Sequence, residues 1–279
     1  MKKDWIGKYM NEFLKADFIN EIGRTADQMY QNGWHERNSG NISYLLTGSE
    51  LDLVRDLKGI RVIELQCEVK DLEGKCFVVT GSGKYIKNIS RDPLLNLGVI
   101  RVLKGGKQVE ILGGFKDGGR PTSELSTHLL THQERLRQDQ AHKVVIHTHA
   151  TNIMAMTFVH ELNDRSFTRS LWQMCTESIV VFPDGVGILP WMLCGNERIG
   201  YKTAEKMKNH RLVVWAMHGV FASGSSLDDC FGLIETVEKS AQIYLMTLGK
   251  QMVNTIEDYQ LKELAETFEV NYKKEYLDV

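Results

Sequence analysis

Short apolar runs rich in β-branched residues alternate along this chain with longer segments of helical periodicity. Runs of this kind, bounded by Gly, Asp or Asn, are typical of buried strands. We expect strands at Asn41–Leu46, Cys76–Thr80, Lys143–His147, Ser178–Phe182 and Leu212–Met217. Helices and strands mixed in this order predict a layered α/β fold, in which helices cover a sheet. The pattern does not distinguish a parallel sheet from an antiparallel one.

Four segments have the apolar spacing of amphipathic helices. They are residues 13–30, 124–138, 196–209 and 227–249. Asn32 and Gly33 follow the first segment and provide the left-handed stop that commonly ends a helix. Ser226 stands before the last segment, and with Asp229 it resembles a capping box.

No Pro-rich or Ser-rich linker, repeat or low-complexity tract divides the 279 residues, so we expect one domain over residues 1–279. The formal net charge is −2 with no basic block, which argues against nucleic-acid binding. No apolar stretch reaches the ~20 residues that a bilayer requires. The five cysteines are widely spaced and form no C-x-x-C pair, so we expect reduced thiols in a cytoplasmic protein.

Eight of the nine histidines lie between positions 128 and 218. His147 and His149 end the apolar run KVVIHTHA, and in an extended strand both imidazoles leave the same face. His218 ends a second run, LVVWAMHG, and Gly219 permits a turn or a close backbone approach. Three neutral imidazoles with a fourth position open are the ligands of a catalytic zinc site. The alternative that each histidine only hydrogen-bonds a loop stays open at this point.

A second cluster competes for a metal. Glu124, His128 and His132 are spaced i, i+4 and i+8, which places them on one helical face. This helix lacks the glutamate beside the first histidine that defines the H-E-x-x-H hydrolase motif. The other histidines have charged and polar neighbours, and we expect them on the surface. These are His35, His142, His160 and His210.

Three short segments combine small residues with hydroxyls or amides and are suited to holding an anion. They are 38–41 (NSGN), 80–83 (TGSG) and 121–123 (PTS). The third directly precedes a helix, whose free N–H groups attract phosphate. TGSGKY is not a P-loop, because the motif requires Gly at Val78 and Ser or Thr at Tyr85. Each segment alone could be a simple turn.

The motifs PTSE, HTHA and WAMHG, in this order and spacing, resemble the class II sugar-phosphate aldolase family, which also contains ribulose-phosphate 4-epimerases and adducin head domains. The resemblance extends over nearly the whole chain. It is carried by GWHERNSGNIS, FVVTGSGK, DPLLNLGVI, PTSELSTHLLTHQERL, FTRSLWQMCTESIVVFPDGVGILPWM and FGLIETVEKSAQ. Residues 46–75, 102–118 and the last thirty match poorly, so no role is assigned there.

The resemblance implies a mixed or antiparallel sheet with helices on both faces. It also implies a homotetramer that cleaves a phosphorylated ketose to dihydroxyacetone phosphate and an aldehyde. By resemblance, His147, His149 and His218 bind one zinc ion, Glu124 is the acid/base, and Glu177 reaches a neighbouring subunit's site. His128 and His132 then have packing or supporting roles. The implied phosphate and substrate residues are Asn38, Gly40, Asn41, Ser82, Gly83, Thr122 and Ser123.

Two other classes of protein are possible from the residues. A zinc hydrolase would require only the three histidines and an open position, but it would leave the three anion-holding segments unexplained. A non-enzymatic interaction protein that resembles adducin heads would be expected to have lost metal ligands. The presence of all three histidines and Glu124 favours an enzyme.

Overall fold

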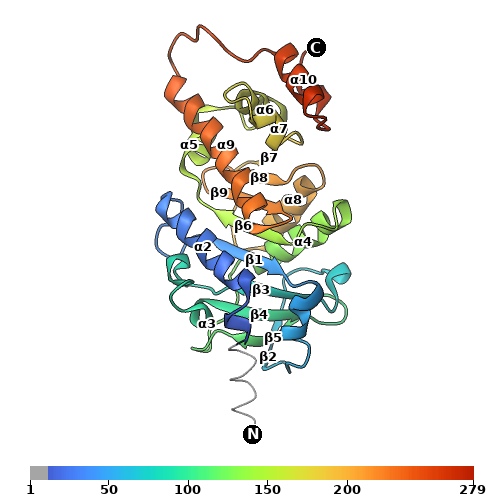
Figure 1. Ribbon diagram of the computed structural model, residues 1–279. Coiled ribbons are helices and arrows are strands. Elements are labelled where there is room, and N and C mark those ends of the chain that lie inside the picture. The colour runs from blue at the N-terminus through green and yellow to red at the C-terminus, as the bar shows by residue number, and fades with distance from the viewer. Residues whose placement is uncertain (1–11) are drawn as a thin grey trace.

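The computed structural model describes residues 12–279, and within them a nine-stranded sheet forms the centre of the molecule. Its order is β2-β5-β4-β3-β1-β6-β9-β8-β7 (Figure 1). Neighbouring strands are antiparallel except β7 and β8, which are parallel. The expected mixed sheet is confirmed. The strands are β1 Asn41–Leu45, β2 Arg61–Glu64, β3 Cys76–Thr80, β4 Leu97–Val102, β5 Gln108–Gly114, β6 Val144–Thr148, β7 Val186–Leu189, β8 Leu212–Trp215 and β9 Gly219–Gly224.

Helices cover both faces of this sheet, as expected. The period-two alternation of β6 decides which core each residue enters: Val144 and Ile146 face one apolar core, and Val145 faces the other. Helices α2, α5, α6 and α9 contribute to the first core, whereas α4 and α8 pack on the opposite face. The α-helices are α2 Asp17–Gln31, α3 Pro93–Asn96, α4 Leu125–Gln138, α5 Thr151–Val159, α6 Asp164–Trp172, α7 Ser178–Val181, α8 Glu197–Met207, α9 Leu227–Thr247 and α10 Asp258–Thr267.

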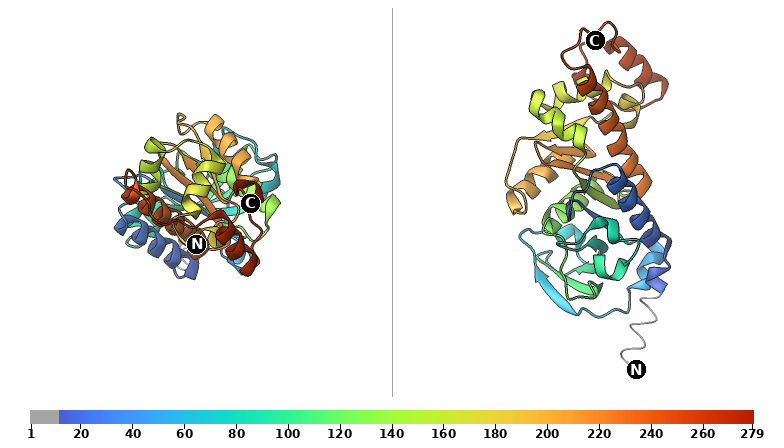
Figure 2. Two further views of the ribbon diagram at one scale, coloured as in Figure 1. Left: turned by 90° about the horizontal axis from the view of Figure 1, so that it is seen from above. Right: turned by 90° about the vertical axis from the view of Figure 1, so that its left-hand side faces the viewer.

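The molecule is elongated along the direction in which the strands succeed one another. β2 lies near one end and α10 at the other (Figure 1). α2 and α9 run side by side along the same side of the sheet (Figure 2). None of the helices in residues 12–279 is long and apolar enough to cross a membrane.

The predicted helix ends agree closely with the structure at three of four segments. α2 begins at Asp17 rather than at residue 13, because Ala16 has an extended backbone with ψ of 136°. Ser226 accepts a hydrogen bond from the backbone N–H of Asp229 and so caps α9. The Asp229 carboxylate accepts from Ser225 rather than from Ser226, so only half of the predicted capping box forms.

The strand predicted at Ser178–Phe182 is wrong. Ser178–Val181 forms the short helix α7, closed by backbone hydrogen bonds from Val181 to Glu177 and from Phe182 to Ser178. The hydroxyl groups of Ser178 and Ser240 of α9 also form a hydrogen bond of 2.7 Å. β-branched composition favours a strand only where a partner strand is available, and here the segment packs against helices instead.

Candidate active site

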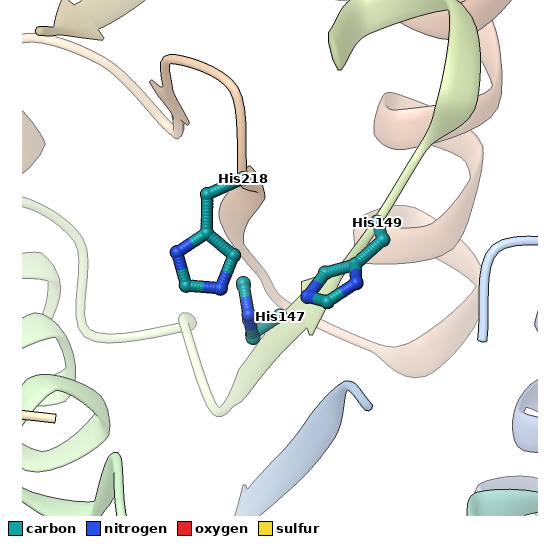
Figure 3. Close-up of side chains that lie close together, drawn as sticks. All are labelled: His147, His149 and His218. Atoms are coloured by element: carbon teal, nitrogen blue, oxygen red, sulfur yellow. The ribbon is translucent and has the colours of Figure 1, made fainter. Parts of the chain in front are cut away.

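Three histidines from two parts of the chain meet at the end of the central strand β6. His147 belongs to β6, His149 follows that strand, and His218 lies in the tight turn between β8 and β9. Their ring centroids are 5.1 to 5.2 Å apart. One nitrogen from each ring lies within 4.8 Å of the others (Figure 3). The predicted trio is therefore a cluster that could hold a metal ion.

Gly219 is required by this arrangement. A Cβ atom there would lie 2.5 Å from the carbonyl oxygen of Thr148 and 3.0 Å from the His149 ring. Real side chains do not tolerate the first of these distances. The glycine therefore allows β9 to approach β6 closely enough for the His218 turn to reach the other two histidines.

Two of the three imidazoles are held by hydrogen bonds through Nδ1. His147 Nδ1 lies 2.9 Å from the carbonyl oxygen of Val220, to which it donates. His149 Nδ1 lies 2.7 Å from a carboxylate oxygen of Glu36. In each ring the Nε2 atom is thus left as an acceptor, the state that metal coordination requires. The Nε2 atom of His147 is buried and makes no hydrogen bond within the described residues.

Burial keeps the rings of His147 and His218 neutral. The pKa of His147 lies well below its usual value because of burial and, secondarily, the neighbouring His149 and His218. Burial, followed by His149, lowers the pKa of His218 to about 4. Neutral imidazoles near pH 7 have free lone pairs, so the donor set suits a cation.

Glu124 places a carboxylate beside this cluster. It occupies the N-cap position of α4, where its side chain makes no capping hydrogen bond, and it is 8% exposed. Its Oε2 lies 3.5 Å from Nε2 of His147 and accepts a 2.8 Å hydrogen bond from the amide of Asn41. Burial raises its pKa, and the Asn41 hydrogen bond only partly opposes that rise. A carboxyl group with a raised pKa next to a metal-capable cluster is suited to proton transfer.

The three anion-holding segments also converge here. The amides of Ser82 and Thr122 donate to the carbonyls of Arg120 and Thr80, both at 2.9 Å, which joins TGSG to PTS. Asn41 pairs with His147 in the β1–β6 register and bonds Glu124, which joins NSGN to the same place. The segments NSGN and PTS, about eighty residues apart in the chain, thus lie together beside the histidine cluster.

The family model described as the class II aldolase and adducin N-terminal domain matches residues 20–245, most of this chain. The chain belongs to the class II aldolase and adducin family. A rhamnulose-1-phosphate aldolase from Listeria innocua is 51% identical over 269 residues, which cover 96% of this chain and 98% of the relative. A rhamnulose-1-phosphate aldolase from Enterococcus faecalis is 47% identical over 267 residues, 95% of this chain and 96% of its own.

Solved structures agree with this membership. A sugar-phosphate aldolase from Thermotoga maritima superposes with a TM-score of 0.74 at 28% identity, covering 85% of this chain and 98% of that one. An L-fuculose 1-phosphate aldolase superposes with a TM-score of 0.61 at 18% identity over 91% and 97% of the two chains, a likeness of fold alone. The expected class II aldolase fold is confirmed.

In this class II aldolase fold, the competing helical cluster does not form a metal site of its own. His128 and His132 are fully buried, and both contact the hydroxyl of Ser43, at 2.7 and 2.8 Å. His128 also contacts the side-chain oxygen of Asn41. Ser43, His128, Asn41 and Glu124 therefore form a continuous chain of polar contacts between β1 and α4 that ends at the candidate acid/base. Burial lowers the pKa of His128 to about 3, which keeps its ring uncharged near pH 7.

The expectation that four further histidines lie on the surface is wrong for three of them. His35, His142 and His210 are buried, and His160 is half-buried. The two ring nitrogens of His35 contact the Ser39 carbonyl and the Thr148 hydroxyl at hydrogen-bond distance. Nδ1 of His210 donates to the carbonyl of Asp184. His142 meets the Ser223 hydroxyl across β9. Polar neighbours in the sequence did not indicate exposure, because hydrogen-bond partners far along the chain make burial acceptable.

Glu177 does not join the histidine cluster. It is exposed at the N-terminus of α7, and its carboxylate accepts a 2.9 Å hydrogen bond from the thiol of Cys175.

Asn38, Ser82, Gly83 and Ser123 are exposed on the anion-holding segments, whereas Asn41 and Thr122 are buried.

Sequence reasoning missed two residues of the site. Glu36, which holds His149, lies 113 positions away from it in the chain. Cys194 lies near Glu124 and His218, with ligand atoms of all three within 4.8 Å of one another. Glu36 stands in GWHERNSGNIS, but no spacing rule links it to a histidine on another strand.

Proposed function

We propose that this chain cleaves L-rhamnulose 1-phosphate reversibly to dihydroxyacetone phosphate and L-lactaldehyde, as a metal-dependent aldolase of L-rhamnose degradation. The observation that carries the proposal is the Glu124 carboxyl group 3.5 Å from Nε2 of His147, beside three histidines able to bind one cation. The names of relatives about half identical over almost the full chain support the choice of substrate.

The proposed metal is one zinc ion per subunit, held by His147, His149 and His218. Three imidazoles, two of them oriented through Nδ1 by Val220 and Glu36, suit zinc, and so does the buried Nε2 of His147, which makes no hydrogen bond within the described residues. A bound zinc ion would supply Lewis-acid stabilisation of the negative charge that develops on the substrate.

Glu124 is the proposed acid/base. In cleavage, the hydroxyl on carbon 4 loses its proton, the bond between carbons 3 and 4 breaks, and its electron pair remains on carbon 3. The protonated carboxyl group of Glu124 then donates a proton to carbon 3, and in the reverse reaction the carboxylate removes it. Asn41 fixes the carboxylate by its 2.8 Å hydrogen bond, and burial raises the pKa so that the acid form is more populated.

The proposed phosphate cradle consists of the three anion-holding segments, in which Asn38, Ser82, Gly83 and Ser123 are exposed and Thr122 is buried. Hydroxyl and backbone N–H groups there would bind the phosphate and fix the reacting carbons relative to Glu124. Asn41 is already engaged with Glu124 and His128, so we assign it to positioning rather than to phosphate binding. The proposed binding residues are Asn38, Gly40, Ser82, Gly83, Thr122 and Ser123.

We further propose a cytoplasmic homotetramer with a single domain over residues 1–279. Glu177 is exposed and makes no contact with the cluster in its own chain, within the part that the structure describes. A role for its carboxylate in a neighbouring subunit's site, such as accepting the carbon 4 hydroxyl proton, would explain this position.

An assay coupled to dihydroxyacetone phosphate release tests the proposal. We expect turnover of L-rhamnulose 1-phosphate, its loss on chelation and its recovery with zinc. L-fuculose 1-phosphate, which differs in stereochemistry, is the comparison substrate and should react more slowly. Turnover unaffected by complete metal removal, or faster turnover of the fuculose ester, would overturn the zinc or the substrate assignment respectively.

A further inference from the structure

Cys194 lies beside the proposed active site on a loop that the proposed reaction does not use. The loop joins β7 to α8, and Cys194 is exposed within it. Asn196 caps α8 by accepting from the Ile199 amide, and its side-chain amide donates to the carbonyl of Leu193 at 2.7 Å. Gly195 has a φ of 72°. These features hold the backbone on both sides of Cys194 in a defined turn.

Three different donor groups meet at this turn. A ligand atom from each of Glu124, Cys194 and His218 lies within 4.8 Å of the other two. Glu124 is buried, His218 is partly buried and Cys194 is open to solvent, so an ion arriving from outside reaches the thiol first. In Figure 3 one ring nitrogen of His218 points toward His147 and His149, and the other points away from them.

The two groups of metal-capable residues differ in the kind of ligand atom that they offer. His147, His149 and His218 offer only nitrogen, whereas the second set adds sulfur. Thiolate is a soft ligand that favours thiophilic cations, while imidazole binds zinc and other borderline ions well. Because His218 belongs to both sets, filling the second set changes the ligands available to the first.

We propose that Glu124, Cys194 and His218 form a second cation site, selective for a thiophilic divalent ion such as cadmium, that overlaps the three-histidine site through His218. Binding there engages the Glu124 carboxylate. The ion therefore inhibits the enzyme by removing its acid/base, a consequence that rests on the proposed function. The binding itself does not depend on that function.

The zinc-saturated protein of 279 residues, mixed with increasing cadmium, provides the test. The readouts are the ultraviolet thiolate-to-cadmium charge-transfer band and the cadmium retained per chain after gel filtration. We expect a band that saturates at one cadmium ion per chain. Cys194→Ser should abolish the band and weaken cadmium binding at least roughly tenfold, since even residues outside the ligand shell change metal affinity by that factor.

Cys175→Ser is the matched control, because Cys175 is the other cysteine that is not buried. It should leave the band unchanged. Glu124→Gln should keep the band and weaken cadmium binding. A band that survives in Cys194→Ser, a band lost in Cys175→Ser, or cadmium binding unchanged in Glu124→Gln would overturn the site. None of these readouts requires turnover, so a failed substrate assignment would be recognised separately in the coupled assay.

Discussion

Glu124 Oε2 and His147 Nε2 lie 3.5 Å apart, although one belongs to the start of a helix and the other to a central strand. α4 packs on the same face of the sheet as the ring of His147, which stacks on Phe221 with centroids 4.5 Å apart. The packing of α4 therefore places Glu124, at the N-cap position of this helix, next to the histidine cluster. Because the carboxylate and the imidazoles come from different elements, proton transfer by Glu124 and metal binding by the histidines can be tested by separate mutations.

Glu124→Gln should slow hydrogen exchange at carbon 3 of dihydroxyacetone phosphate by ~10²–10⁴, because the amide cannot transfer the proton. Zinc content should stay the same. Exchange followed by NMR and metal analysis of the same sample measure both. Glu134→Gln, a buried glutamate on the same helix, is the control and should exchange normally. Normal exchange in Glu124→Gln would remove this residue from the reaction.

Glu36→Gln should weaken zinc binding by about 10–100-fold, because the charge that holds Nδ1 of His149 is lost. Competition with a chromophoric chelator measures the affinity. Glu266→Gln changes an exposed glutamate on α10 and should bind zinc as tightly as the unmodified protein. Equal affinities in all three proteins would show that Glu36 does not support the metal site.

Ser82→Ala should raise the KM for L-rhamnulose 1-phosphate by roughly tenfold, the loss expected for one hydrogen bond to a charged group. The KM for unphosphorylated L-rhamnulose should not change, because that ketose has no phosphate to bind. Steady-state kinetics with both sugars separate the two effects, and Ser49→Ala serves as an exposed control. A matching rise for both sugars would refute phosphate binding by this hydroxyl.

Gly40→Ala should destabilise the protein by on the order of 2–5 kcal/mol. Gly40 has a φ of 72°, and a Cβ atom there would lie 1.9 Å from the His35 ring. Gly33→Ala shares the backbone strain, with φ of 76°, but its Cβ meets nothing within 4 Å, so about 1 kcal/mol is expected. Urea unfolding of both variants isolates the steric contribution. Equal losses would mean that the His35 ring moves aside freely.

Acid should destabilise the metal-free protein already at pH values at which carboxylates with ordinary pKa values are still ionised. Burial lowers the pKa of His128 to about 3, whereas in the unfolded chain it is about 6.5. Between these values the unfolded state binds a proton that the folded state does not, so stability falls as pH decreases. His128 alone contributes about 1.4 kcal/mol per pH unit in this window. Urea unfolding with chelator at about pH 7 and about pH 5 measures the slope, and equal stabilities would contradict it.

Local patterns predicted those parts of the fold where local and tertiary preferences agree. β3 has the predicted bounds, and β1, β6 and β8 differ from them by at most two residues at either end. Ser178–Phe182 has strand composition but packs as a helix, because no strand in the described chain is beside it to pair with. Hydrogen-bond partners decided the outcome for His35 and His210, and these partners lie on segments distant in sequence.

The sequence by itself determined the α/β class, the family and the histidine pair His147 and His149, because these depend on short-range periodicity and on motifs. Only the tertiary structure decided that Glu36 holds His149, that Asn41 holds Glu124 and that Cys194 lies beside His218. Each of these pairs joins residues on different elements. Their proximity follows from strand order, helix packing and loop conformation, which no spacing along the chain encodes.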